Sequence, residues 1–144
     1  MAITSTGADL ASRLRVAVLR TNRRLRQEAG GELSPTLLAT LGTISRHGPL
    51  TPSELAQRER IQRPTATRLL ARLEDPGYVA RTPDPQDGRS SLVSVTPAGA
   101  ALLAALRDRK DAFLARRLRG LSADERATLR RASDILERML EDPR

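Results

Sequence analysis

The sequence contains no cysteine, one histidine and only two aromatic residues, Tyr78 and Phe113. Without cysteine the chain has no disulfide framework, no thiolate nucleophile and no cysteine-based redox sensor. A single histidine, His47, excludes metal sites made of clustered histidines and argues against a histidine-dependent catalytic triad. Two aromatic residues do not make the stacking platform with which proteins bind single-stranded nucleic acid. These absences disfavour redox, metal-dependent and RNA-binding functions.

Other features that the sequence lacks concern catalysis and membranes. The sequence has no glycine-rich phosphate loop, and its carboxylates do not occur at spacings suited to a catalytic pair or a metal site. No apolar run approaches the roughly 18 residues of a membrane span, and the N-terminus lacks the apolar core of a signal peptide. We therefore expect a cytoplasmic protein that is not an enzyme and holds no metal or cofactor.

Arginine, in contrast, is abundant. The 144 residues carry a formal net charge of +8, and Lys110 is the only lysine among the 25 basic residues. A positive charge of this size favours a polyanionic partner such as nucleic acid. The arginines are spread along the whole chain, so their positions, and not their number, must support such a function. The length and composition fit one folded domain, residues 1–144.

The most informative stretch runs from Arg60 to Val95. Its first part has the periodicity of a helix lying on a core, with an apolar stripe of Ala66, Leu69, Leu70 and Leu73. The outward side carries arginine, threonine and proline: Arg63, Pro64, Thr65, Thr67, Arg68 and Arg72. Pro76 and Gly77 end the helix. Its start is less well marked, because Gln62 is not a preferred N-cap residue.

Two short β-prone runs, residues 78–82 and 92–95, follow this helix, joined by a polar loop rich in proline, aspartate and glycine. The pattern predicts a β-hairpin with Arg89 near its tip. An amphipathic helix followed at once by such a hairpin is the layout of a winged helix-turn-helix. Its helix fits the major groove of duplex DNA, and the hairpin tip reaches the adjacent minor groove.

Apolar periodicity and capping signals predict five other helices. Ser34 caps one of them, and Thr51 and Ser122 each begin a capping box. Residues 1–8 are expected to form a loose leader, and His47 to lie in the last turn of its helix. The expected helices cover residues 9–29, 35–47, 52 to 58–60, 97–119 and 122–141.

The expected fold is mainly α with a small β-hairpin. A winged helix-turn-helix lobe spans about residues 33–96, between flanking helices in about residues 9–29 and 97–142. The flanking helices do not build the lobe, yet they carry long apolar stripes that need a partner. In a chain this small, a second copy is the economical partner, so we predict a homodimer with N- and C-terminal dimerisation helices.

Particular side chains are expected to contact duplex DNA. Arg68, near the centre of the outward face, is the best candidate for a bidentate contact with a guanine. Arg63 and Arg72 lie at the edges of that face and are expected to contact phosphates. Arg89 is expected to enter the minor groove, where narrow A·T tracts attract cations. Further candidates have a structural alternative at a helix start: Ser34, Thr36, Ser53, Pro64, Thr65 and Thr67.

With this order of elements, the sequence resembles the multiple-antibiotic-resistance regulator (MarR) family of bacterial transcription factors. The most specific match is residues 84–93, which follow the family's wing motif of Asp, any residue, Arg, three more residues, then Leu or Val. Residues 50–56, 63–70 and 73–79 resemble the family's third helix, its recognition helix and the exit into the wing. Gln62 and Pro76 depart from the pattern at helix ends.

The resemblance implies a homodimer on a palindromic operator, usually a repressor, often released by a small aromatic acid. In the family the wing aspartate holds the wing arginine, so Asp87 is expected to form an ion pair with Arg89. The chain lacks the cysteine and the clustered histidines of the peroxide-sensing and zinc-sensing members. The sequence specifies neither the operator nor the effector.

We hypothesise an effector pocket bounded by the helices that begin at Asp9, Ser34 and Pro97. A molecule there would change the separation of the two recognition helices of a dimer. Arginines of the first helix offer partners for a carboxylate: Arg13, Arg20 and Arg24. The alternative is a non-catalytic nucleic-acid-binding or architectural protein that has no small-molecule effector.

Overall fold

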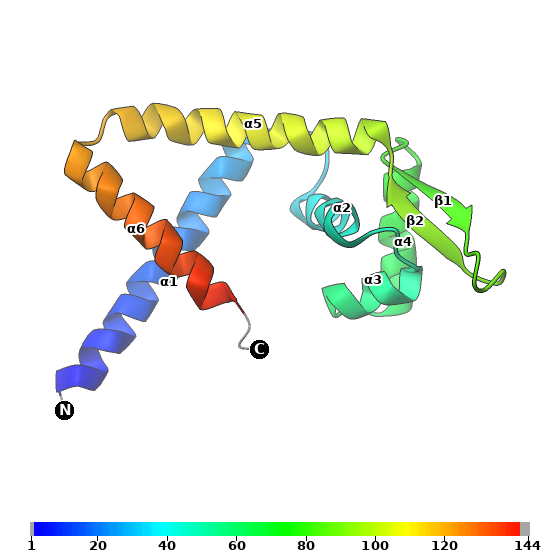
Figure 1. The fold of residues 1–144 in the computed structure, drawn as a ribbon, viewed down its shortest axis with the longest axis horizontal. Helices are drawn as coiled ribbons and strands as arrows, with labels where there is room; N and C mark the ends of the chain where they lie inside the picture. The colour runs from blue at the N-terminus through cyan, green and yellow to red at the C-terminus, as the bar shows by residue number, and fades with distance from the viewer. Residues whose placement is uncertain (1, 142–144) are drawn as a thin grey trace.

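The computed structural model describes residues 2–141, with side chains from Gly7 onwards (Figure 1). Six helices and one two-stranded antiparallel hairpin make up this part of the chain, so the expectation of a mainly helical fold with a small hairpin is confirmed. The elements are α1 (Ala2–Ala29), α2 (Pro35–His47), α3 (Pro52–Glu59), α4 (Arg63–Glu74), β1 (Val79–Pro83), β2 (Ser91–Val95), α5 (Pro97–Arg119) and α6 (Ala123–Leu140). No helix within residues 2–141 is both long and apolar enough to cross a membrane.

A compact lobe is built from α2, α3, α4 and the hairpin. Their apolar faces form one buried cluster: Leu37, Leu41, Ile44, Leu50, Leu55, Ala56, Ala66, Leu70, Leu73, Val79 and Val93. The hydroxyl of Thr43 on α2 donates a hydrogen bond to the carboxylate of Glu59 on α3, which satisfies a buried polar group. The predicted caps at Ser34, Thr51 and Ser122 all form, and Thr96 caps α5.

The hairpin is attached to the lobe by a short additional bridge. Strands β1 and β2 pair from Val79↔Val95 to Pro83↔Ser91. Leu50, just before α3, pairs with Val93 through two backbone hydrogen bonds of 3.0 and 2.7 Å. This bridge fixes the base of the hairpin beside the start of the helix-turn-helix.

The beginning of α1 differs from the sequence prediction. The helix starts at Ala2, so the expectation of a loose leader over residues 1–8 is wrong for residues 2–8; Met1 lies outside the described residues. No proline interrupts this segment, and once a helix has nucleated each added residue gains a backbone hydrogen bond. Gly7 lowers helix propensity by only about 1 kcal/mol, which the continuing helix tolerates.

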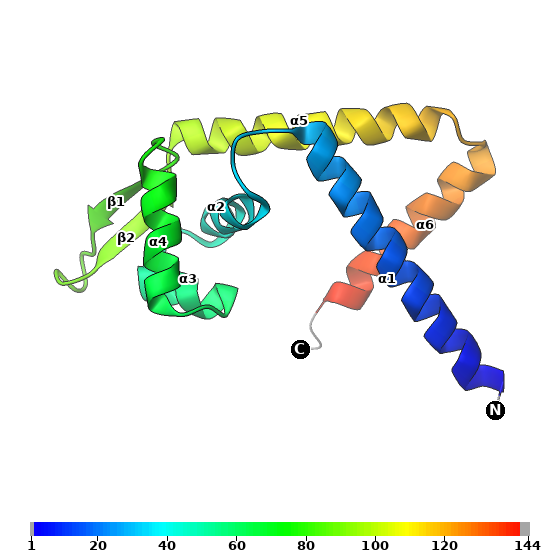
Figure 2. The same cartoon turned by 180° about the vertical axis from the view of Figure 1, so that it is seen from behind.

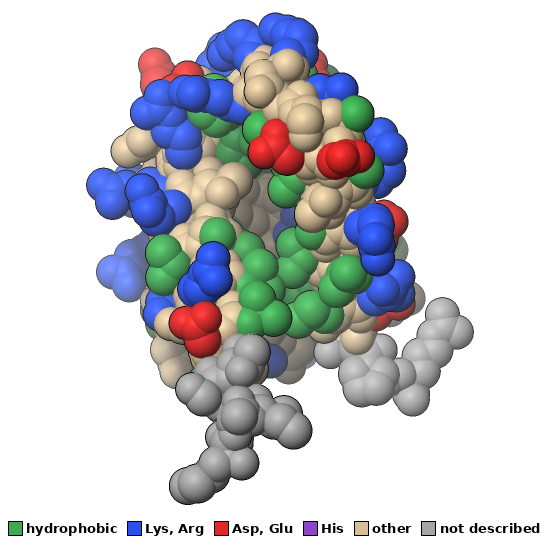
Figure 3. Space-filling model, turned by 90° about the vertical axis from the view of Figure 1, so that its left-hand side faces the viewer, with side chains coloured by type: hydrophobic (Ala, Val, Ile, Leu, Met, Phe, Trp, Pro, Cys, Tyr) green, Lys and Arg blue, Asp and Glu red, His purple; other side chains and the backbone are tan. Residues whose placement is uncertain are grey.

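The long helix α5 joins the lobe to a second region, where α1 and α6 extend away from the lobe (Figures 1 and 2). Arg109 of α5 donates a 2.8 Å hydrogen bond to the carbonyl of Ala29, which holds the end of α1 against α5. Helix α6, in contrast, has no buried residue. Hydrophobic side chains gather between charged rims on this end of the molecule (Figure 3).

Arg60, in the turn between α3 and α4, is the only described non-glycine residue with a positive φ (53°). Left-handed backbone brings the Cβ of such a residue close to a carbonyl oxygen. We expect Arg60→Gly to raise the free energy of unfolding by about 0.5–1 kcal/mol, measured by urea denaturation. Arg58→Gly is the control, because it removes the same charge from a helical position and should cost about 1 kcal/mol. Equal changes in both variants would contradict this explanation.

Candidate DNA-binding surface

Helix α3 begins at a fixed position because both bonds of its capping box form. The hydroxyl of Thr51 accepts from the Glu54 amide at 3.2 Å, and the Glu54 carboxylate accepts from the Thr51 amide at 2.8 Å. The chain then turns at Arg60 into α4. Gln62 caps α4 without a side-chain hydrogen bond, as its poor capping propensity predicts.

Helix α4 separates its residues into an inner and an outer face. Ala66, Leu70 and Leu73 are fully buried against the lobe. Outward side chains are exposed, apart from half-buried Thr65: Arg63, Pro64, Thr65, Thr67, Arg68 and Arg72. Within residues 2–141 the ion pairs are Arg24–Glu28, Arg81–Glu74 and Arg107–Asp108, so the outer-face arginines have no carboxylate partner there. The structure therefore presents a cationic helix face to solvent.

Local hydrogen bonds restrict two of the threonines. Arg68 donates to the hydroxyl of Thr65 at 3.4 Å, which directs the guanidinium along the outer face. The hydroxyl of Thr67 donates to the carbonyl of Arg63 at 3.1 Å, so its hydrogen is already engaged within the helix. Thr65 thus acts as a partner that orients Arg68, while Thr67 retains only acceptor capacity and its methyl group for an outside contact.

An ion pair that the sequence analysis missed joins α4 to the wing. The Nε of Arg81 lies 2.6 Å from a carboxylate oxygen of Glu74, and both side chains are about one-third exposed. Glu74 ends α4 and Arg81 lies on β1, so the pair spans the turn at Pro76 and Gly77. The sequence did contain a signal for this ion pair, because residues of opposite charge lie on either side of a tight turn. The contact joins the end of α4 to the first strand of the hairpin.

The wing tip is organised by aspartate side chains. Asp84 accepts from the Gln86 amide at 2.9 Å, and Asp87 accepts from the Arg89 amide at 3.0 Å. The expected ion pair between Asp87 and Arg89 is wrong for this structure, since Asp87 holds the backbone and not the guanidinium of Arg89. Aspartate commonly bonds the amide two residues on, which closes a tight turn. The Arg89 side chain remains exposed at the tip.

The remaining predicted residues begin helices. Ser34 caps α2 by accepting from the Leu37 amide at 3.3 Å, and Thr36 is exposed in the same first turn. Ser53 is exposed in the first turn of α3. The structure does not assign these three residues to the surface formed by α4 and the wing. Within residues 2–141 no three His, Asp or Glu side chains are arranged to hold a metal ion.

Comparisons with known proteins agree with this arrangement. Residues 33–91, which run from just before α2 to the first residue of β2, match the model of the MarR family. An uncharacterized HTH-type transcriptional regulator of Mycobacterium bovis is 42% identical, over 94% of this chain and 95% of its own length. The multiple antibiotic resistance protein MarR of Salmonella typhimurium is 36% identical, over 68% of this chain and 69% of its own length.

Solved structures give the same fold over nearly the whole chain. A putative transcriptional regulator of Pseudomonas aeruginosa is 34% identical and superposes with a TM-score of 0.86, over 96% of this chain and 98% of its own. A MepR mutant of S. aureus bound to an oligodeoxyribonucleotide superposes with a TM-score of 0.71, over 92% of this chain and 98% of its own. That protein is 21% identical, so this likeness concerns the fold alone.

Proposed function

Because this chain belongs to the MarR family of HTH-type transcriptional regulators, we propose that it is a homodimeric repressor that binds a palindromic operator. Membership makes it a DNA-binding regulator and not an enzyme. The observation that carries the finer proposal is the exposed face of α4, beside a wing that presents Arg89. The arginines of this face have no carboxylate partner within residues 2–141.

Unsatisfied apolar surface supports the dimer. Leu129, Ile135, Met139 and Leu140 of α6 are 46, 45, 65 and 84% exposed. On α1 Leu10 is 64% exposed and Leu19 57%. Helices with this much apolar surface are not stable alone in water, and a second copy offers the complementary surface. We assign dimerisation to α1, α5 and α6, and DNA binding to a lobe of about residues 33–96.

The proposed DNA contacts follow from the surface. Arg68 reads a guanine, Arg63 and Arg72 bind phosphates, and Arg89 enters the minor groove. Asp87 supports the tip through the backbone of Arg89. The smaller side chains are proposed to contact phosphates or thymine methyl groups: Ser34, Thr36, Ser53, Pro64, Thr65 and Thr67. A two-fold dimer presents two copies of α4, which fits half-sites about one helical turn apart.

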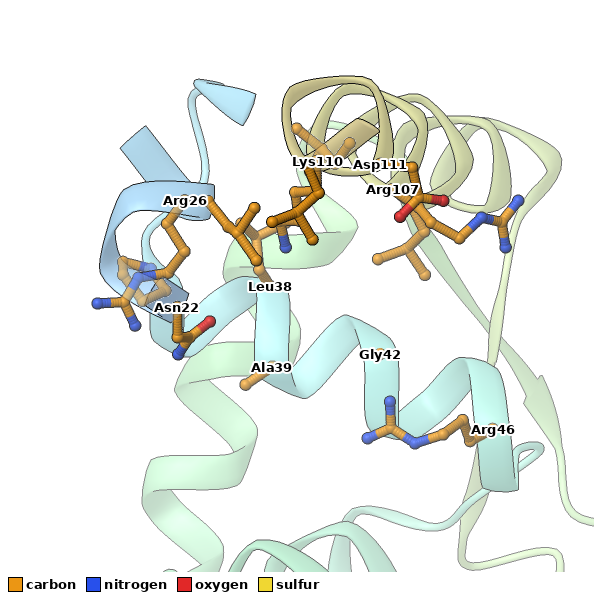
Figure 4. A pocket seen from close by; sticks show the side chains of 14 residues that line it. Asn22, Arg26, Leu38, Ala39, Gly42, Arg46, Arg107, Lys110 and Asp111 are labelled. Carbon is orange, nitrogen blue, oxygen red and sulfur yellow. The ribbon is translucent and has the colours of Figure 1, made fainter. Parts of the chain in front are cut away.

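A cavity of about 460 Å³ between α1, α2 and α5 supports control by a small acid (Figure 4). The cavity predicted between these three helices is present, but its cations are not the predicted ones. Arg26, Arg46, Arg107 and Lys110 line it with Asp111, whereas Arg13, Arg20 and Arg24 do not. An apolar portion includes Leu25, Leu38, Leu103, Leu106 and Leu114. We propose that a small aromatic acid binds there, with its ring on the leucines and its carboxylate on a cation, and lowers DNA affinity.

The proposal of a dimer on a palindromic operator is tested by selecting bound sequences from random duplex DNA and by sedimentation of the purified chain. An inverted repeat and a dimer are the expected results, with duplex operator outcompeting single-stranded RNA at matched salt. Removal of residues 122–144 should cause aggregation or unfolding. Unrelated selected sequences, or a folded monomer after that removal, would reject the proposal.

The effector proposal is tested by calorimetry of a panel of phenolic acids, with and without operator DNA. The inducer should bind roughly 5- to 150-fold more weakly to the DNA-bound protein, because linkage makes the coupling reciprocal. Arg46→Gln should weaken binding of the acid, whereas Arg130→Gln on α6 should leave it unchanged. If every bound acid has the same affinity for free and DNA-bound protein, the chain is a regulator without this effector class.

A further inference from the structure

A second cavity, of about 500 Å³, lies where α1 meets α5. Its α1 side consists of Arg20, Thr21, Arg23, Arg24 and Gln27, and its α5 side of Phe113 and Leu114. Leu114 also lines the proposed effector cavity, but none of the cations does. In the single chain the five α1 residues are exposed, so the cavity opens to water there and suits a hydrated, polar ligand.

The charge in this cavity is of one sign. Three of its seven lining residues are arginines, and no carboxylate lines it. Arg24 is neutralised by Glu28 at 2.6 Å, whereas Arg20 and Arg23 have no ion-pair partner within residues 2–141. Like charges held on one helix face repel each other, and a bound anion relieves that repulsion.

Phe113 holds two guanidinium groups at the site. Phe113 is 8% exposed, and the Cζ atoms of Arg24 and Arg117 lie 5.6 and 5.2 Å from the centroid of its ring. Both distances are within the range of cation–π attraction. Arg117 on α5 therefore adds a fourth cation beside the cavity. With two cations already against the ring, a ligand is recognised by charge and not by stacking on Phe113.

We propose that this cavity binds a small, multiply charged anion of the phosphate class. The planar guanidinium matches phosphate oxygens with paired hydrogen bonds, and Arg20 and Arg23 are available for such contacts. Thr21 and Gln27 supply hydroxyl and amide donors beside them. The lack of a lining carboxylate favours a di- or trivalent anion over the monovalent aromatic acid proposed for the other cavity.

Titration calorimetry with inorganic pyrophosphate, on the full chain without DNA and at physiological salt, tests this site. Physiological salt screens diffuse attraction between the protein and the anion. The expected result is one pyrophosphate site per chain. Its affinity should fall at least about tenfold in the Arg20→Gln/Arg23→Gln variant, since contacts to charged groups are lost. The matched control is Arg130→Gln/Arg131→Gln, which removes the same charge from exposed positions of α6. Thermal melting should show that both variants remain folded.

Three outcomes would overturn the proposal. The first is no binding of pyrophosphate, as when a partner copy covers the cavity. The second is equal weakening by the two double variants, which indicates general charge attraction. The third is binding that survives Arg20→Gln/Arg23→Gln but is displaced by operator DNA, which places the anion on the DNA-binding surface. The first two outcomes leave the proposed operator and acid effector unaffected.

Discussion

Gly99→Ala is expected to lower the free energy of unfolding by about 3 kcal/mol or more, a large part of the stability of a small domain. A Cβ at position 99 would lie 2.2 Å from the carbonyl oxygen of Tyr78 and 2.9 Å from a methyl carbon of Val95. To relieve this steric clash, the backbone before β1 would have to move away from α5. That backbone is held, because Thr96 donates its amide to the same Tyr78 carbonyl at 3.0 Å. Urea denaturation followed by circular dichroism measures the change.

Gly88→Ala is the matched control for this effect. Gly88 lies in the wing loop, and a Cβ there meets nothing within 4 Å. The same chemical change should therefore alter stability by no more than about 0.5 kcal/mol. Comparable losses in both variants would show that the contact of α5 with the wing does not limit stability.

Arg68→Ala is expected to cost about 1–3 kcal/mol in operator affinity and to relax the sequence preference. Arg68 is exposed on α4 and donates a hydrogen bond to Thr65, so its loss would remove the proposed base contact without disturbing the core. Arg72→Ala should instead weaken binding to operator and random DNA to the same degree. It should also reduce the salt dependence of binding by about one released ion. Fluorescence anisotropy on both DNAs over a range of salt separates the two effects.

A variant in the wing can be compared with the two variants in α4. Arg89→Ala should lose most affinity on operators with A·T-rich flanks, where the narrow groove concentrates negative potential. If Arg68→Ala and Arg72→Ala reduce affinity for specific and random DNA in the same proportion, the proposed reading face is incorrect. The wing assignment would then need its own test, because Arg89 lies on a different element.

Helix α5 connects the proposed effector cavity to the wing. Its first turn packs against Tyr78 and β2 at Gly99, and its middle lines the proposed effector cavity at Leu103, Arg107 and Lys110. The same helix continues to Phe113, beside the proposed anion site. In the proposed dimer, a ligand that shifts the middle of α5 would therefore change the spacing of the two α4 helices.

The sequence by itself determined the local features of this protein. Ends of helices were predictable where a capping residue or glycine lies within a few positions, as at Thr51, Ser122 and Gly120. The inner face of α4 was predictable because a period of 3.6 residues places Ala66, Leu70 and Leu73 together. The weakest local signals, at residues 2–8, gave the one wrong helix start.

Only the tertiary structure decided which distant residues meet. It paired Glu74 with Arg81 and bridged Leu50 to Val93. It also placed Arg26 and Arg46 in one cavity and Arg20 and Arg24 in another, although all but Arg46 lie on α1. Helical periodicity fixes which residues share a face, but the neighbour of that face depends on how α1 crosses α5. That crossing results from packing between segments about 80 residues apart, such as Arg109 on the carbonyl of Ala29, which no local pattern encodes.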